Sequence, residues 1–140
     1  MPNWCLNEVR ISFEDEETRK EFEKAIQGTK PESVPVGPGE TINQRVPVVI
    51  EFNSILPEPE EEDHDWHDWR CVNWGTKWEP DIIHYDVGID GTEIYLEMYT
   101  AWSPPEGIYN KLCEDWEDKG VHINWFYRED GMQFAGWLPH

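Results

Sequence analysis

Asn73-Trp74-Gly75-Thr76-Lys77-Trp78-Glu79-Pro80 is the stretch around which the rest of the chain is arranged. It places a glycine between two tryptophans and closes on a proline, a combination that is unusual inside a strand or a helix. It holds two of the nine tryptophans of the chain and directly follows its most acidic run. We interpret this stretch as a fixed turn or as a surface built for contact.

The size of the chain bounds the fold. A chain of 140 residues corresponds to one domain that is able to bury a core without disulfides or metals. Tryptophan is abundant, and each aromatic side chain buries a large area. We therefore expect a single domain over residues 1–140, with inserted loops at about 28–47 and 54–72.

The net charge of the chain limits the kinds of molecule that it is expected to bind. The formal net charge is −19, from 30 acids and 11 bases, and direct binding to a phosphate backbone needs the opposite sign. An acidic surface fits instead a protein with a basic surface, such as the cleft of a nucleic-acid-binding enzyme. The densest acidic surface is expected at Glu58, Glu60, Glu61, Glu62, Asp63, Asp65 and Asp68.

Cysteines and apolar runs indicate the compartment. Cys5, Cys71 and Cys113 are widely spaced and odd in number, so we expect reduced thiols and no disulfide framework. The N-terminus has no signal-peptide pattern, and no apolar run of about 18 residues is present to span a membrane. These features predict a protein of the cytoplasm.

The N-terminal segment predicts a strand followed by a helix. Residues 3–12 alternate apolar and polar side chains, as in a half-buried strand. Ser12 is the expected N-cap of the helix, with Asp15 at the third helical position in a capping box. Gly28 is expected to end the helix.

The middle of the chain predicts irregular structure. The density of proline and glycine over residues 28–47 predicts a long loop. Residues 48–52 predict a short strand or the entry to the next segment. In the acidic segment, Trp66 and Trp69 favour an amphipathic helical turn that docks its indoles.

The C-terminal half is more regular. Strands at 81–89 and 93–102 are expected to form a hairpin around the turn dipeptide Asp90-Gly91. Ser103 is the expected N-cap of a second helix, with Pro104 in its first turn and Glu106 closing a capping box.

That second helix is expected to close at Lys119-Gly120, and strands over 121–128 and 132–138 follow it. The order of elements predicts an α+β fold of the ferredoxin-like βαββαβ type, with two helices on one face of an antiparallel sheet and an extra C-terminal strand.

Five blocks occur in a fixed order along the chain: Pro2-Asn3-Trp4-Cys5 with Asn7, Phe52-Asn53-Ser54-Ile55-Leu56-Pro57 followed by Pro59, Asn73 to Trp78, Thr100-Ala101-Trp102-Ser103-Pro104-Pro105, and Gly131-Met132-Gln133-Phe134-Ala135-Gly136. Together they resemble the YubB-like, or Api-like, ferredoxin-like domain family of phages and plasmids. The resemblance covers essentially the whole chain, apart from a variable middle.

The resemblance implies a ferredoxin-like fold without an iron–sulfur cluster, and an origin on a mobile element. The chain lacks the clustered cysteines that such a cluster needs. The resemblance implies no particular activity, so no catalytic residue is carried over. The acidic segment 58–68 departs from the neutral insert expected there and favours a specialised partner.

Catalytic and metal chemistry find little support in the sequence. His64-x-x-His67-x-x-x-Cys71 has the spacing of metal ligands, but no complementary pair follows, and an acidic helix explains it more simply. Cys5 and Cys113 are expected in the core, since neither has a histidine nearby in sequence to activate it. We expect no catalytic residue, metal or cofactor.

The tryptophan motifs admit two interpretations. In one, they form an aromatic core that straps the long loops onto the sheet. In the other, they line a partly polar pocket that stacks a planar ligand such as a nucleotide, and Lys77 lies over an indole. The candidate binding residues are Trp4, Asn7, Asn73, Trp74, Thr76, Lys77, Trp78 and Trp102.

Three functions follow as hypotheses. We favour a non-enzymatic accessory protein that binds a host or defence protein through its acidic surface, as a nucleic-acid mimic or inhibitor would. The second hypothesis is a binder of nucleotides or other small ligands that uses the Trp74, Lys77 and Trp78 surface. The third is an enzyme of unspecified type.

Overall fold

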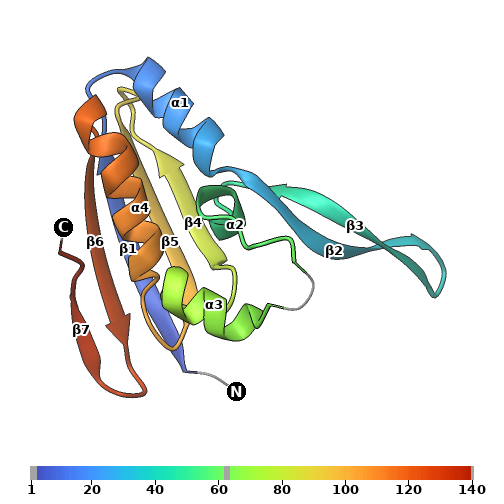
Figure 1. The fold of residues 1–140 in the computed structure, drawn as a ribbon. Coiled ribbons are helices and arrows are strands. Elements are labelled where there is room, and N and C mark those ends of the chain that lie inside the picture. The colour runs from blue at the N-terminus through green and yellow to red at the C-terminus, as the bar shows by residue number, and fades with distance from the viewer. Residues whose placement is uncertain (1–2, 62–63, 140) are drawn as a thin grey trace.

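A computed structural model describes residues 3–61 and 64–139 of the chain. Glu62 and Asp63, two of the candidate acidic residues, lie outside this described part. In the described residues, a five-stranded antiparallel sheet carries four α-helices, and a separate two-stranded hairpin projects from this body (Figure 1). The predicted α+β class is confirmed.

The sheet has the strand order β4-β5-β1-β6-β7. Each neighbouring pair is antiparallel, and β1 lies at the centre between β5 and β6. The bounds are Trp4–Ser12 for β1, Asp81–Val87 for β4, Glu93–Ala101 for β5, His122–Glu129 for β6 and Phe134–Trp137 for β7.

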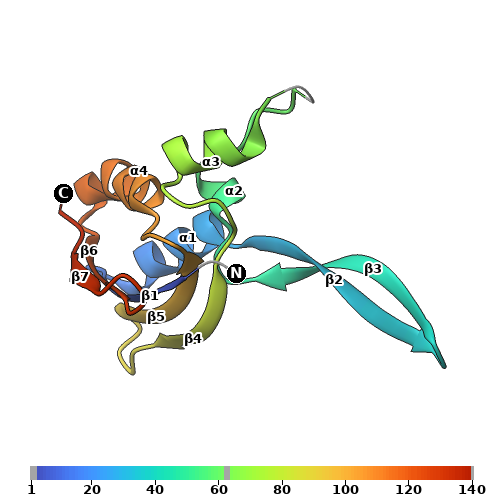
Figure 2. The same ribbon diagram turned by 90° about the horizontal axis from the view of Figure 1, so that it is seen from below.

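The helices gather on one face of the sheet (Figure 2). Helix α1 follows β1, α2 and α3 come from the middle of the chain, and α4 continues into the 3₁₀ helix η1. The bounds are Glu16–Ile26 for α1, Phe52–Ile55 for α2, Trp66–Asn73 for α3, Glu106–Trp116 for α4 and Glu117–Lys119 for η1. Helix α3 is the helical turn expected in the acidic segment, but of its two indoles Trp69 packs against the core while Trp66 is 46% exposed. None of the helices in the described part is long and apolar enough to cross a membrane.

The core lies between the sheet and these helices. Val9 on β1 stands in register with Leu96 on β5 and with Trp125 on β6, and all three are buried. Phe22 of α1 and Ile108 of α4 are fully buried against this layer. Each such side chain stabilises the fold by about 1.5–3 kcal/mol through burial.

The prediction of a long loop over residues 28–47 is wrong. These residues form the hairpin of β2 (Gly28–Gly37) and β3 (Glu40–Val48), which extends away from the body as an arm (Figure 1). Proline is tolerated in strands whose N–H groups face outward from a sheet edge. A two-stranded ribbon consists of two such edges, so the proline density does not prevent strand pairing here.

The predicted helix starts are displaced. Ser12 belongs to β1 and pairs with β5 and β6, so Asp15 is the true N-cap of α1 and its carboxylate accepts the Thr18 N–H at 2.7 Å. Of the two alternatives for residues 48–52, the strand is wrong and the entry to the next segment holds: β3 ends at Val48, Ile50 is buried, and α2 begins at Phe52. Long-range pairing decides these boundaries over the local signals.

Helix α4 begins at Glu106, and Ser103 does not cap it. The Ser103 hydroxyl donates instead to the carbonyl of Gly75, at 2.6 Å. Other expectations hold: Asp90-Gly91 lies in the turn between β4 and β5, and Gly120 closes the second helical segment with a left-handed φ of 77°.

Candidate functional site

The stretch at residues 73–80 is a tight connection between α3 and β4. Gly75 has a φ of 93°, and a Cβ there would lie 2.7 Å from the backbone nitrogen of Glu106. Gly107 N–H donates to the carbonyl of Trp74 at 3.0 Å, and a Cβ on Gly107 would lie 1.7 Å from the Asn73 carbonyl oxygen. The two glycines therefore let this turn dock directly against the first turn of α4.

Trp74 is a core residue. Its side chain has no exposed surface, and its indole N–H donates to the carbonyl of Leu56 at 2.8 Å. The rings of Phe52 and Trp69 lie edge-on to it, with centroids 5.7 and 6.1 Å away. Trp74 thus joins α2, α3 and the following turn into one aromatic cluster.

Arg70 connects this cluster to the acidic segment. Its guanidinium carbon lies 4.6 Å from the ring centre of Trp74 and 5.2 Å from that of Trp66. The guanidinium also donates to Glu58 at 2.6 Å and to the carbonyl of Lys77 at 3.2 Å. Glu58 therefore forms an ion pair within the chain and is less available to contact a partner.

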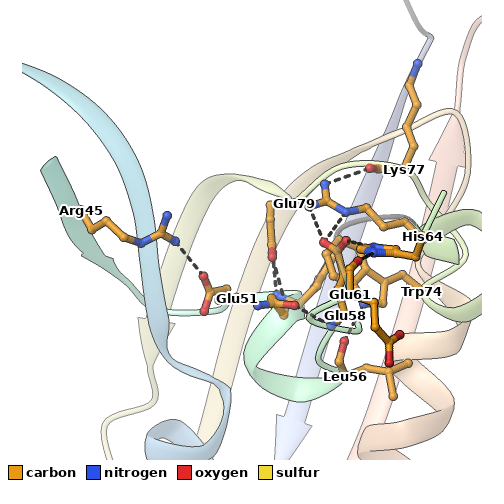
Figure 3. A network of polar contacts seen from close by, with 12 residues as sticks. Arg45, Glu51, Leu56, Glu58, Glu61, His64, Trp74, Lys77 and Glu79 are labelled. Atoms are coloured by element: carbon orange, nitrogen blue, oxygen red, sulfur yellow. Dashed lines mark hydrogen bonds and ion pairs between the residues drawn. The ribbon is translucent and has the colours of Figure 1, made fainter. Parts of the chain in front are cut away.

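His64 approaches the other oxygen of Glu58, with its Nε2 atom at 3.3 Å. Its second ring nitrogen lies 2.6 Å from the Glu61 carbonyl oxygen. These two hydrogen bonds, the one to Glu61 first, raise the pKa of His64 above its ordinary value. The first part of the acidic segment is thereby folded back onto α3 (Figure 3).

Glu79 closes the N-terminus of α2. Its two carboxylate oxygens accept the backbone N–H groups of Phe52 at 2.6 Å and Asn53 at 3.0 Å (Figure 3). Burial raises the pKa of Glu79, and these hydrogen bonds only partly offset that effect. Helix capping explains the buried position of this carboxylate.

A groove of about 470 Å³ lies on the outer side of the same turn. Trp102, 45% exposed, forms part of its wall, and its φ of 70° is a left-handed value that non-glycine residues seldom adopt. Thr76 fixes the floor, since its hydroxyl donates to the carbonyl of Ala101 at 2.8 Å. The groove is lined by His67, Cys71, Gly75, Thr76, Lys77, Ala101, Trp102 and Ser103.

Two further candidate tryptophans lie close to this turn. The Lys77 ammonium is 4.4 Å from the ring centre of Trp78, and the Trp4 ring lies 6.0 Å from Trp78. The fold therefore gathers Trp4, Thr76, Lys77, Trp78 and Trp102 at one end of the sheet. Pairing of Trp4 with Ala101 at the ends of β1 and β5 accounts for this.

Three candidate residues lie elsewhere. Trp74 is in the core, and the Asn73 amide donates within α3 to the Trp69 carbonyl at 2.8 Å. Asn7 is fully buried: its amide donates to Thr100 at 2.9 Å, and its oxygen accepts the Trp125 indole N–H at 2.9 Å. Asn7 thus serves to satisfy polar groups inside the core.

Sequence reasoning missed some residues of the groove. His67 and Cys71 were weighed as metal ligands, and their spacing of four residues on α3 places both at the groove. No group of three or more ligand-type side chains within the described residues is arranged to hold a metal ion. Ser103 was assigned to a helix cap, and the sequence holds no signal for its contact with the turn.

The cysteines differ in environment. Cys5 is fully buried, and this burial raises its pKa to about 11, away from the thiolate that a nucleophile needs. Cys113 is also buried, and burial likewise raises its pKa. Cys71 is exposed. The prediction of core cysteines holds for the two residues for which it was made.

Acidic side chains are exposed in two regions. Asp65 caps α3 by accepting the Asp68 N–H at 3.2 Å, and Glu60, Glu61 and Asp68 are exposed beside it. A second group lies where α1 begins and α4 ends, because the Glu14 carboxylate lies against Gly120. The exposed acids of this second group are Glu14, Asp15, Glu16, Glu17, Glu117 and Asp118.

Comparison of the chain with protein-family models, curated proteins and solved structures found no match.

Proposed function

We propose that this chain is a non-enzymatic accessory protein of a phage or plasmid, with a ferredoxin-like fold, that acts in the host cytoplasm. The order β4-β5-β1-β6, with α1 after β1 and α4 after β5, supports this topology. In this proposal β7 is an added edge strand and β2–β3 is an insertion. The origin on a mobile element rests on the sequence blocks described above.

The proposed activity is binding of a host or defence protein through the acidic helical surface. The observation that carries it is the group of six exposed acids where α1 meets the end of α4. Of these, Asp15 caps α1, Glu16 pairs with Arg19 and Lys20, and Glu117 also interacts within the chain, so the proposal rests on Glu14, Glu17 and Asp118. Side chains that keep their charge in water are available to a basic partner, whereas Glu58 is already neutralised by Arg70.

A group of exposed carboxylates also suits a basic cleft that normally holds nucleic acid. Such binding is expected to associate rapidly and to weaken as salt screens the charges. The proposal therefore predicts a partner with a basic surface and an affinity that depends steeply on ionic strength.

The test is affinity capture from an extract of the host cell, followed by identification of the captured protein. The variant Glu14→Gln/Glu17→Gln/Glu117→Gln/Asp118→Asn removes four charges and leaves the Asp15 cap in place. We expect wild type to retain a basic protein at about 50 mM salt and to lose it at about 500 mM. The variant is expected to lose it at both concentrations.

The matched control is Glu32→Gln/Glu40→Gln, which removes charges from the distant arm and should leave capture unchanged. Circular dichroism verifies that each variant folds. A captured protein that resists high salt and is retained by the four-fold variant would contradict the proposal.

A second function is favoured by the groove beside Trp102. Its volume of about 470 Å³, one half-exposed indole and the nearby Lys77 suit a planar anionic ligand such as a nucleotide. Since Trp74 is enclosed in the core, the ligand would contact Trp102 instead of Trp74.

This second function predicts that a nucleotide raises the melting temperature, since a ligand that binds the native state stabilises it. The measurement is a thermal melt with a panel of nucleoside mono-, di- and triphosphates, repeated with Trp102→Ala. A melting temperature that no nucleotide changes would exclude this function.

A further inference from the structure

The arm formed by β2 and β3 has two faces of different character. Val34 pairs with Ile42, and Lys30 pairs with Val46, four residues further along each strand and therefore on the same side. Ile42 is 48% exposed, and Val36 at the tip is 56% exposed. We call this side the apolar face; it carries Lys30, Glu32, Val34, Ile42, Gln44 and Val46.

The opposite side is polar. The Ser33 hydroxyl lies 2.9 Å from the Asn43 side-chain oxygen, and Arg45 donates to the hydroxyl of Thr29 at 2.7 Å. Contacts between its own side chains thus engage four polar residues of this face. The apolar face lacks such cover, because within the described residues the two strands pair only with each other.

Prolines limit how a partner is able to approach the arm. Pro31, Pro35 and Pro47 all fall on the polar face, at alternate positions of the register. Since proline has no N–H, the bonds between β2 and β3 come from the other positions, and the prolines stand where N–H groups would point outward. Addition of a further strand along the β2 edge is therefore blocked at two positions. Packing against the apolar face remains open.

The base of the arm is fixed to the body. Arg45 pairs with Glu51 at 3.2 Å (Figure 3). The Glu51 N–H donates to the Ile26 carbonyl at 2.9 Å. A Cβ on Gly28 would lie 2.4 Å from a Glu51 carboxylate oxygen, so the chain is closely packed there. The arm is thus held in an extended position, although an isolated two-stranded hairpin is only marginally stable in water.

Charge distinguishes the arm from the body. Residues 28–48 contain two bases and two acids, Lys30, Arg45, Glu32 and Glu40. The whole formal charge of −19 therefore resides outside the arm. Two bodies repel each other, and the arm is where two copies of this chain are able to meet without that repulsion.

We propose that the apolar face of the arm binds the same face of a second copy, giving a symmetric dimer. Two arms packed face to face bury Val34, Ile42 and Val46 of both copies and form a two-layered ribbon. The face carries one lysine and one glutamate, so it is complementary in charge to itself, as a two-fold interface requires. Since the arm extends away from the body (Figure 2), the two acidic bodies of such a dimer stay apart.

Sedimentation equilibrium of the full chain tests this proposal. We expect a mass near 16.6 kDa at about 1 μM and twice that mass at about 1 mM. Ile42→Lys and Val34→Lys should each raise the dissociation constant of the dimer more than about tenfold, since they place a charge inside the interface. The controls Thr41→Lys and Asn43→Lys add the same charge to the polar face and should leave the constant unchanged.

The effect of salt distinguishes binding through this interface from binding through the acidic surface. Raising salt from about 50 to 500 mM should strengthen the dimer, because it screens repulsion between the bodies, while it weakens binding to a basic partner. All four lysine variants should keep the melting temperature of the diluted wild type, since the arm lies outside the core. A chain that stays monomeric up to about 1 mM, or a dimer that Ile42→Lys leaves intact, would overturn the proposal.

Discussion

Ile94 on β5 and Ile42 on β3 are the same residue type in antiparallel strands of similar length, yet 1% of one and 48% of the other is exposed. Both strands have a partner along their length. What differs is the layer above them, since helices cover β5 (Figure 2), whereas β3 lies in the arm.

This difference shows which interactions stabilise the body. A hydrogen bond between strands contributes only about 0.5–1.5 kcal/mol net, because water satisfies the same groups in the unfolded chain. Burial of an apolar side chain contributes about 1.5–3 kcal/mol. The body has both contributions and the arm has mainly the first, so substitutions in the two regions should differ in effect.

Trp74→Ala is expected to cause the largest loss, about 3–5 kcal/mol in the free energy of unfolding. It removes a fully buried indole, leaves the Leu56 carbonyl without its donor, and takes away one of the two rings that hold Arg70. Denaturation by urea, followed by circular dichroism, measures this change.

Trp102→Ala is the matched control, because Trp102 lies at the same end of the sheet but is 45% exposed. It should cost far less than Trp74→Ala. An equal loss of unfolding free energy in the two variants would show that Trp74 stabilises the turn and not the buried aromatic cluster.

Ile94→Ala should lower the free energy of unfolding by about 2–5 kcal/mol. The side chain faces Ile11 across the pair of β5 with β1, and both lie under the helices. The midpoint of the urea transition should fall, while the slope stays that of wild type. A loss under about 1 kcal/mol would contradict the comparison, because it would mean that the helices contribute little to β5.

Much of the body was predictable because its signals are local. The turn at Asp90-Gly91 and the helix end at Gly120 both need a glycine with positive φ, and both glycines have it. Alternation of apolar and polar residues likewise identified β1 and β5. These features depend on residues that are close in sequence.

The arm and the candidate site were less predictable because they depend on distant contacts. Prolines in the sequence predict an irregular segment. In the arm, however, they occupy positions whose backbone nitrogen points away from the partner strand, so no hydrogen bond between the strands is lost. Asn7 looked like a binding residue, but its partner Trp125 is 118 positions away and makes it part of the core. Ser103 has the sequence pattern of a helix cap, and its actual acceptor is the Gly75 carbonyl.

Glu79→Gln tests the cap of α2, a part of the body, through its pH dependence. Burial raises the folded-state pKa of Glu79 above its ordinary value of 4.5. A raised pKa means that the folded chain holds this proton more tightly than the unfolded chain does. The protonated carboxyl therefore contributes its full stabilisation below the ordinary value of 4.5, and this contribution is lost as pH rises through the folded-state pKa. The variant has no such proton and should lack this loss.

The measurement is the free energy of unfolding of both proteins at several values between about pH 4 and pH 7. The difference between wild type and Glu79→Gln should shift in favour of the variant as pH rises. Glu60→Gln, an exposed carboxyl in the same part of the chain, serves as the control. A difference that is constant across this range would show that burial does not govern the Glu79 carboxyl.

Ile42→Ala should have the smallest effect, within about 0.5 kcal/mol of wild type when the chain is diluted to about 1 μM. The side chain is half exposed on a strand that, within the described residues, pairs with β2 alone, so its removal opens no cavity in the body. At about 1 mM the same substitution should become costly, because the dimer proposed above buries Ile42 in its interface. Hydrogen exchange of the arm amides at both concentrations measures this directly. Equal protection at the two concentrations would mean that the apolar face of the arm stays uncovered, whereas protection that rises with concentration in wild type and not in Ile42→Ala would assign its cover to a second copy.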